Sequence, residues 1–226
     1  MLFYIYFMEG AVMEKTMETA AYKVLLEGGQ GEIVEKKSRF IATVRSCETE
    51  EEAQAFLEEM KKRYWDAKHN CFAYVLGSRG EYTRYSDDRE PAGTAGKPML
   101  EVLLGEGIRN VAVVVTRYFG GTLLGTGGLV RAYTQAVQEG LRNCVVGVMR
   151  QGMELSVETD YNGVGKLLYL FGQEQIEPLE CSYGECVKWK LIVPVDRVEK
   201  LEKEMTDVTN GKVTIHRGDT RYFVDK

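Results

Sequence analysis

Apolar side chains along the first two-thirds of the chain recur with the periods of strands and helices. Residues 111–119 open with five apolar side chains in a row, which is typical of a strand buried on both faces. After Thr49, apolar side chains fall on one helical face, and Glu52 completes a capping box with Thr49. The other strands predicted here are 22–26, 31–37, 39–45 and 71–76, and the other helices are 94–104 and 127–143.

A second pattern begins near residue 147 and predicts the element order β-α-β-β-α-β. Asp160 and Asp196 each precede a run with helical period, so we expect them to cap two helices. This order is that of a ferredoxin-like domain. We therefore expect fold class α+β, with one domain over 19–146 and a ferredoxin-like βαββαβ domain over 147–226. The strands of the second domain are predicted at 153–157, 175–183, 187–193 and 212–215.

The first 18 residues are expected to form an extended or disordered N-terminus ahead of both domains. Their apolar run, LFYIYF at 2–7, is far shorter than the roughly 20 residues that a membrane-spanning helix needs. It also lacks the basic start and the small-residue cleavage site of a signal peptide. We therefore expect a cytoplasmic protein without a membrane partner.

Charge and cysteine content narrow the function classes. The formal net charge is −5 and the pI is about 5.3, so bulk charge does not favour nucleic acid, and any such contact needs a local basic face. The five cysteines form no CxxC pair, and an odd, scattered set predicts reduced thiols. We assign no metal and no cofactor.

Three acidic residues gather in the segment YSDDREPAGTAGKPML at 85–100. Asp87, Asp88 and Glu90 precede a proline and a glycine, so they are expected on a loop. Carboxylates on a loop can bind a divalent cation, act as an acid or a base, or simply cap the following helix. These interpretations stay open, and His69 is a fourth catalytic candidate as a carrier of protons.

The segment RYFGGTLLGTGGLVRAY at 117–133 has five glycines within nine positions, between a buried strand and a helix. Such a turn exposes backbone N–H groups beside a helix start and favours an anion. The sequence matches neither GxxxxGK[ST] nor GxGxxG, so a nucleotide site is not indicated. The alternative is that the glycines only permit a tight turn. The predicted anion or ligand contacts are Thr94, Lys97, Arg117, Tyr118, Gly120, Gly121, Gly125, Gly127, Gly128 and Arg131.

With these residues in view, the chain resembles the bacterial, YigZ-type branch of the IMPACT family. The blocks that carry the resemblance are KSRFIA (37–42), AKHNCFAYVLG (67–77) and the segments 85–100 and 117–133. The family commonly has glycine where this chain has Arg89. The resemblance implies a first domain like the second domain of a small-subunit ribosomal protein, an α/β sandwich with a left-handed βαβ crossover. It implies a second domain similar to the last domain of elongation factor G.

Three functions remain open at this level. Eukaryotic members of the family are regulators of translational control, which makes a translation-associated regulator, or a module that binds RNA or the ribosome, the first hypothesis. The second is an enzyme that acts on a small anionic or phosphorylated substrate. The third is a regulator that docks other proteins, including translation-related ones, without nucleic acid.

One prediction concerns the N-terminus. Because Met8, Met13 and Met17 follow the apolar run closely, we expect translation to start at Met13 or Met17. The intact mass of the protein from its native cells tests this, and a mass equal to all 226 residues would contradict it.

Overall fold

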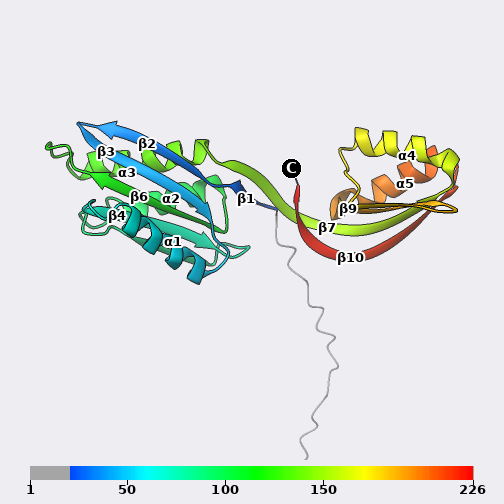
Figure 1. Ribbon diagram of the computed structural model, residues 1–226, viewed down its shortest axis with the longest axis horizontal. Helices are drawn as coiled ribbons and strands as arrows, with labels where there is room; N and C mark the ends of the chain where they lie inside the picture. Colours follow the sequence, from blue (N-terminus) through cyan, green and yellow to red (C-terminus); the bar gives the residue numbers. More distant parts are fainter. Residues whose placement is uncertain (1–20, 226) are drawn as a thin grey trace, which may run out of the picture.

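The computed structural model describes residues 21–225, so the expected N-terminal segment 1–18 lies outside the described residues. Two lobes lie at opposite ends of an elongated molecule and are joined by long strands (Figure 1). Within 21–225, no helix is both long and apolar enough to cross a membrane. The mixture of sheets and helices agrees with the predicted α+β class.

The first lobe is built on a five-stranded sheet in which every neighbouring pair is antiparallel. Since β3 and β4 both run antiparallel to the strand between them, they are parallel to each other, and one helix connects them. In sheet order the strands are β2 (Gly29–Glu35), β3 (Ser38–Ser46), β6 (Val111–Tyr118), β4 (His69–Leu76) and β5 (Tyr82–Ser86).

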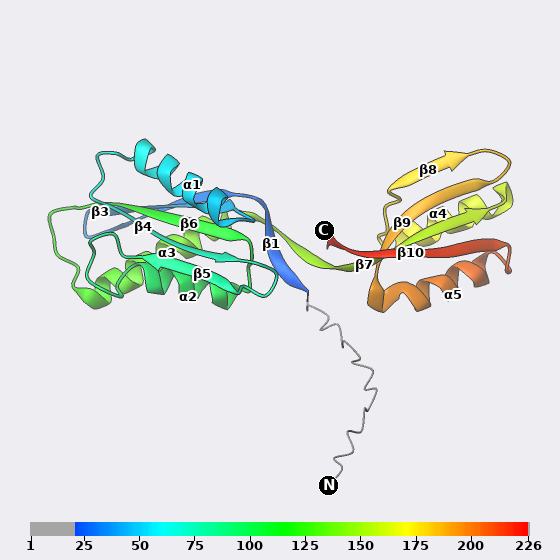
Figure 2. The ribbon, with the colours of Figure 1, turned by 90° about the horizontal axis from the view of Figure 1, so that it is seen from below.

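Helices cover both faces of this sheet, as Figure 2 shows. On one face α1 (Glu50–Arg63) packs on Ala112 and Val114 of β6. On the other face α2 (Gly96–Glu106) and α3 (Thr126–Arg142) pack on the alternate β6 residues, such as Val113. Every residue of β6 except the last is buried. The run of five apolar residues therefore belongs to a strand that is covered on both faces, as predicted.

The second lobe has the predicted β-α-β-β-α-β order. Its sheet runs β10-β7-β9-β8, and the inward faces of the strands close a core with the two helices. Trp189 and Phe171 meet edge-to-face in that core, with ring centroids 5.7 Å apart. The elements are β7 (Val145–Thr159), α4 (Tyr161–Gln173), β8 (Glu180–Tyr183), β9 (Val187–Pro194), α5 (Val198–Val208) and β10 (Val213–Asp225).

Strands β7 and β10 are longer than the sequence pattern predicts, and they make the connection between the lobes (Figure 1). The first part of β7 pairs with β1 (Tyr22–Glu27) on one side and with the end of β10 on the other. The expected domain boundary at 146–147 falls inside β7, which runs through it without a break. Most of β10 is exposed, so it lacks the apolar alternation that would reveal its length.

Two of the three predicted helix caps are confirmed and one is wrong. Thr49 accepts a hydrogen bond from the backbone N–H of Glu52 at 3.2 Å, and Asp160 accepts one from that of Gly163 at 2.9 Å. Asp196 makes no cap, because it lies in a 3-10 turn (Val195–Arg197) that precedes α5 and displaces the helix start.

The two aspartates provide a matched pair of variants. Asp160→Ala removes the acceptor of an N–H at the start of α4 and should lower the free energy of unfolding by about 1 kcal/mol. Asp196→Ala should change it by less than about 0.5 kcal/mol, because Asp196 is exposed and caps nothing. Urea unfolding followed by the fluorescence of buried Trp189 measures both, and equal effects would contradict the assignment.

Candidate functional site

The predicted site segments meet at one end of the first lobe. Strand register places Arg39 opposite Tyr118, and His69 opposite Arg117, so the start of β3, the start of β4 and the end of β6 lie together. In Figure 1 this end is the one farthest from β7 and β10. We call it the distal end, and it comprises the turns 36–37, 64–68, 87–95 and 119–125 with the first turns of α2 and α3.

Asp87 caps helix α2 from a distance along the chain. Its carboxylate accepts hydrogen bonds from the backbone N–H groups of Gly93, Ala95 and Gly96 at 2.8, 3.0 and 2.8 Å. The residue at the N-cap position, Ala95, has no side chain that could do this. Among the roles left open for Asp87, the geometry is that of the helix cap.

Asp88 fixes the loop to the start of β4. Its carboxylate accepts a hydrogen bond from the backbone N–H of Asn70 at 2.7 Å, and its carbonyl oxygen lies 2.8 Å from Nδ1 of His69. A carbonyl oxygen can only accept, so Nδ1 of His69 carries the proton. Asp88 and Arg89 have φ angles of 35° and 68°, in the left-handed region that favours glycine. The nearby guanidinium of Arg89 donates to the carbonyl of Lys68 at 2.7 Å.

Glu90 belongs to a buried polar network. Its Oε1 accepts from Nη1 of Arg117 at 2.6 Å and from the hydroxyl of Tyr133 at 2.9 Å. Sγ of Cys71 lies 3.3 Å from the same hydroxyl and 3.0 Å from the carbonyl oxygen of Asp87. The side chains of Arg117 and Glu90 are only 6% and 4% exposed. Burial raises the pKa of the Cys71 thiol and of Tyr133 well above their ordinary values, so both stay protonated at neutral pH.

The predicted ligand-binding residues fall into two groups. Arg117 is inside, paired with Glu90, and Thr94 is buried and donates to the carbonyl of Pro91 at 2.7 Å. Lys97 is exposed in the first turn of α2, and Arg131 is exposed in the second turn of α3. Within 21–225, no group of three His, Cys, Asp or Glu side chains is arranged to hold a metal ion.

The glycine-rich turn combines close packing with an open helix start. A side chain at Gly120 would meet the backbone of Lys37 at 2.0 Å, and the N–H of Gly120 donates to Oγ of Ser38 at 3.1 Å. Gly121 and Gly125 have φ angles of 87° and 74°. Helix α3 then starts at Thr126, followed by Gly127 and Gly128, with no side-chain cap and no acidic residue in its first turn.

Two exposed side chains at the distal end, those of Trp65 and Leu123, were missed from the sequence, and the ring of Phe119 is exposed at the same end. Trp65 is 83% exposed, Leu123 82% and Phe119 50%. The hydroxyl of Tyr118, beside Phe119, donates to the carboxylate of Asp66, beside Trp65, at 2.8 Å. The signal that could have found Trp65 is its place in KKRYWDAK, a charged stretch that no amphipathic pattern buries.

The basic side chains at this end are largely unpaired. Within 21–225, no carboxylate oxygen lies within 4.0 Å of a side-chain nitrogen of the following residues: Lys36, Lys37, Lys68, Lys97 and Arg131. The three acidic residues of the loop do not offset them fully, because Asp87 and Glu90 turn inward and Asp88 binds the backbone of β4.

Comparisons with known proteins cover the sequence blocks that carry the family resemblance. The Impact N-terminal domain matches residues 36–141, and a domain of unknown function (DUF1949) matches 157–212. This chain belongs to the IMPACT family. IMPACT family member YvyE of Bacillus subtilis is 41% identical over 205 residues, which cover 90% of this chain and 94% of YvyE. IMPACT family member YigZ of Escherichia coli is 36% identical, over 80% of this chain and 89% of YigZ.

The architecture of this IMPACT family member also matches a solved structure. A crystal structure of a hypothetical protein superposes with a TM-score of 0.56 at 33% identity, and the match covers 88% of this chain and 97% of the other. The predicted membership of the bacterial branch is therefore confirmed, and the likeness extends over both lobes.

The buried pair gives a stability prediction. Arg117→Ala leaves the Glu90 carboxylate buried without its cation and should lower the free energy of unfolding by about 3–5 kcal/mol. The matched control, Arg142→Ala, breaks an exposed pair with Glu139 and should cost about 0.5 kcal/mol or less. Urea titrations measure both, and a small effect of Arg117→Ala would contradict the network described here.

Proposed function

We propose that this IMPACT family member is a cytoplasmic, translation-associated module that binds single-stranded RNA, free or on the ribosome, through its distal end. The observation that carries the proposal is that the exposed cations Lys37, Lys68 and Arg131, which pair with no carboxylate of residues 21–225, lie at the same end of the lobe as the exposed rings of Trp65 and Phe119. Basic grooves interleaved with aromatic rings are how proteins bind single strands without reading a particular sequence.

The charge distribution supports this proposal although the chain as a whole is acidic. Many acidic residues elsewhere are matched by cations, as in the pairs Glu59–Arg45 and Glu202–Arg217. At the distal end, by contrast, the carboxylates of Asp87 and Glu90 bind groups of the protein, while the lysines project into solvent without a carboxylate partner among the described residues. Phosphate contacts depend on such local charge and release counterions when they form.

Two aromatic rings stand where bases could stack. The hydrogen bond between Tyr118 and Asp66 brings their sequence neighbours Phe119 and Trp65 to the same end of the sheet. Both rings are exposed, and every base has a face that can stack on them.

Backbone donors at the start of α3 complete the arrangement. The corresponding donors of α2 are already occupied by Asp87, whereas α3 has no side-chain cap. Arg131 lies one turn along α3, and Lys37 packs beside Gly120. A phosphate at this helix start would meet the positive end of the dipole together with two cations.

The resemblance to translation proteins supports the same interpretation. We infer that the first lobe is like the second domain of a small-subunit ribosomal protein, including its left-handed crossover, and that the second lobe is like the last domain of elongation factor G.

An enzyme acting on a small anion is less favoured, since Asp87, Asp88 and Glu90 are all engaged with protein donors. The raised pKa of the Cys71 thiol also makes it a poor nucleophile.

A titration of fluorescein-labelled oligouridine by anisotropy, from about 50 to about 200 mM KCl, tests the proposal. Lys37→Gln combined with Arg131→Gln should weaken binding and reduce the salt slope by about 1.4, because each phosphate that is no longer neutralised removes about 0.7 from the slope. Trp65→Ala should weaken binding by about 5- to 150-fold, as expected when one base no longer stacks on a ring.

Tryptophan fluorescence supplies an independent readout. Of the two tryptophans, Trp65 is exposed and Trp189 is 2% exposed, so RNA should quench only the signal of Trp65. The quenching should vanish in Trp65→Phe.

The matched control carries two changes on the second lobe, Lys203→Gln and Lys212→Gln, at exposed positions without ion pairs among the described residues. Equal weakening in both double variants, or no binding at about 50 mM KCl, would contradict a specific RNA site at the distal end.

A further inference from the structure

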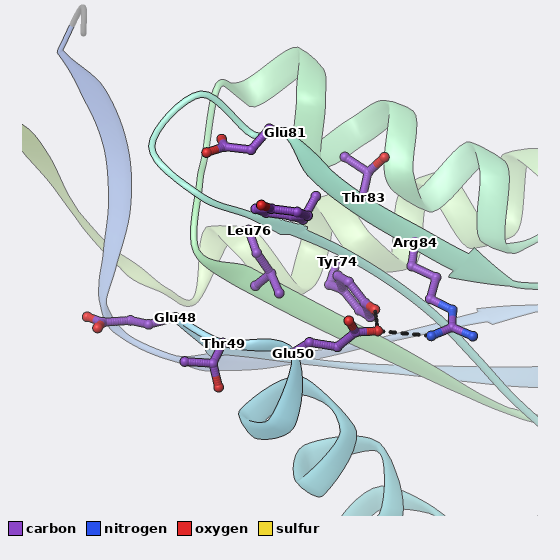
Figure 3. A pocket seen from close by; sticks show the side chains of 9 residues that line it. Glu48, Thr49, Glu50, Tyr74, Leu76, Glu81, Thr83 and Arg84 are labelled. Carbon is purple, nitrogen blue, oxygen red and sulfur yellow. Dashed lines mark hydrogen bonds and ion pairs between the residues drawn. The ribbon is translucent and has the colours of Figure 1, made fainter.

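A cleft of about 490 Å³ lies at the opposite end of the same sheet. It opens between the start of α1 and the strands β4 and β5, as Figure 3 shows. We call it the β5 cleft. Its residues sit at the end of β4 and the beginning of β5, whereas the distal end is formed by the beginning of β4. The β5 cleft is therefore separate from the RNA site proposed above.

The β5 cleft has an apolar floor and an acidic rim. Leu76 and Tyr74 of β4 are buried at its floor, and the ring of Tyr82, which is 68% exposed, forms a wall. The remaining lining residues are polar or charged: Glu48, Thr49, Glu50, Glu81, Thr83 and Arg84.

The rim carries excess negative charge. Glu50 is neutralised by Arg84, whose Nη1 lies 2.9 Å from its Oε1, and it also accepts from the hydroxyl of Tyr74 at 2.8 Å. Among the described residues, no side-chain nitrogen of Lys or Arg lies within 4.0 Å of the carboxylates of Glu48 and Glu81, and Glu81 accepts a hydrogen bond from the backbone N–H of Arg79 at 2.9 Å. Two carboxylates therefore lie on the rim of the cleft without a cationic side chain among the described residues, next to an aromatic wall that can hold a cation.

Strand β5 adds a second, independent feature. It pairs with β4 and has no other strand partner in 21–225, so it is an edge of the sheet. Its sequence, YTRYS, contains no proline and no lysine, and its pairing with β4 runs without a bulge. Edges that lack these protections are templates for an added strand.

We propose that the β5 cleft binds an extended, basic segment of a partner protein. The segment adds to the sheet as a strand beside β5, with main-chain hydrogen bonds to its free edge. Side chains alternate across a strand, and Tyr82 and Arg84 face the cleft opposite Leu76 and Tyr74. A residue of the added strand opposite Tyr82 therefore sends its Lys or Arg side chain into the cleft, toward Glu48 and Glu81.

Charge complementarity selects this occupant over a second copy of the chain. Two β5 strands paired edge to edge would bring the unpaired Glu48 and Glu81 of both copies to one interface. Like charges at a shared interface disfavour association, whereas a basic segment supplies the missing cations.

The test uses a fluorescein-labelled peptide of alternating lysine and threonine, about nine residues long, which is within the usual length of a strand. It should bind the full chain, and Glu48→Gln combined with Glu81→Gln should weaken binding on the order of tenfold. Tyr82→Ala should weaken it as well. The matched control is Glu101→Gln, an exposed acidic residue of α2, and it should leave binding unchanged.

Hydrogen exchange decides whether a strand is added. Backbone amides of β5 should gain protection with the peptide, and a peptide of the same length with glutamate in place of lysine should give none. Unchanged β5 amides, or spermine that binds as tightly as the peptide, would overturn the proposal in favour of a simple amine site. A dimer in light scattering that the peptide dissociates would overturn it in favour of a second copy.

Discussion

The buried ion pair between Arg117 and Glu90 fixes the geometry of the distal end. Arg117 is the last residue but one of the central strand β6, and Glu90 lies in the loop that precedes α2. The pair therefore anchors this loop to the middle of the sheet. Once the loop is anchored, Asp87 can reach the start of α2 and cap it. A buried pair of this kind is costly to break, because either partner alone would be an uncompensated buried charge.

This arrangement separates charge within one small lobe. The acidic side chains that the sequence alone would offer to a ligand turn inward, and the lysines around them remain outside. At the other end of the sheet, Glu48 and Glu81 have no cation of their own among the described residues. The two ends thus present opposite signs about one strand length apart, and a chain of net charge −5 can hold an anionic ligand at one end and a cationic one at the other.

Elements that depend on residues close together in the chain could be predicted from the sequence. The five apolar residues of β6 and the caps Thr49 and Asp160 depend on neighbours in the chain, so they could be predicted. The pairing of Glu90 with Arg117 depends on side chains far apart in sequence, and no local pattern contains it. Strand β5 was missed for a related reason, since an exposed edge strand shows no apolar alternation. Family resemblance supplied the identity of the segments, but not the direction in which their side chains point.

The continuous strand β7 has a consequence for how the protein is made. Tyr22, near the start of the described chain, pairs with Met149, which a ribosome adds only after the whole first lobe has been synthesised. Until then, among the described residues, β1 has only a single bridge, between Lys23 and Ile108, so most of its backbone groups stay unpaired while the first lobe is synthesised. Strand β10 closes the other side of β7 only after residues 213–225 have been made. The ribbon between the lobes is therefore completed later than the five-stranded sheet of the first lobe.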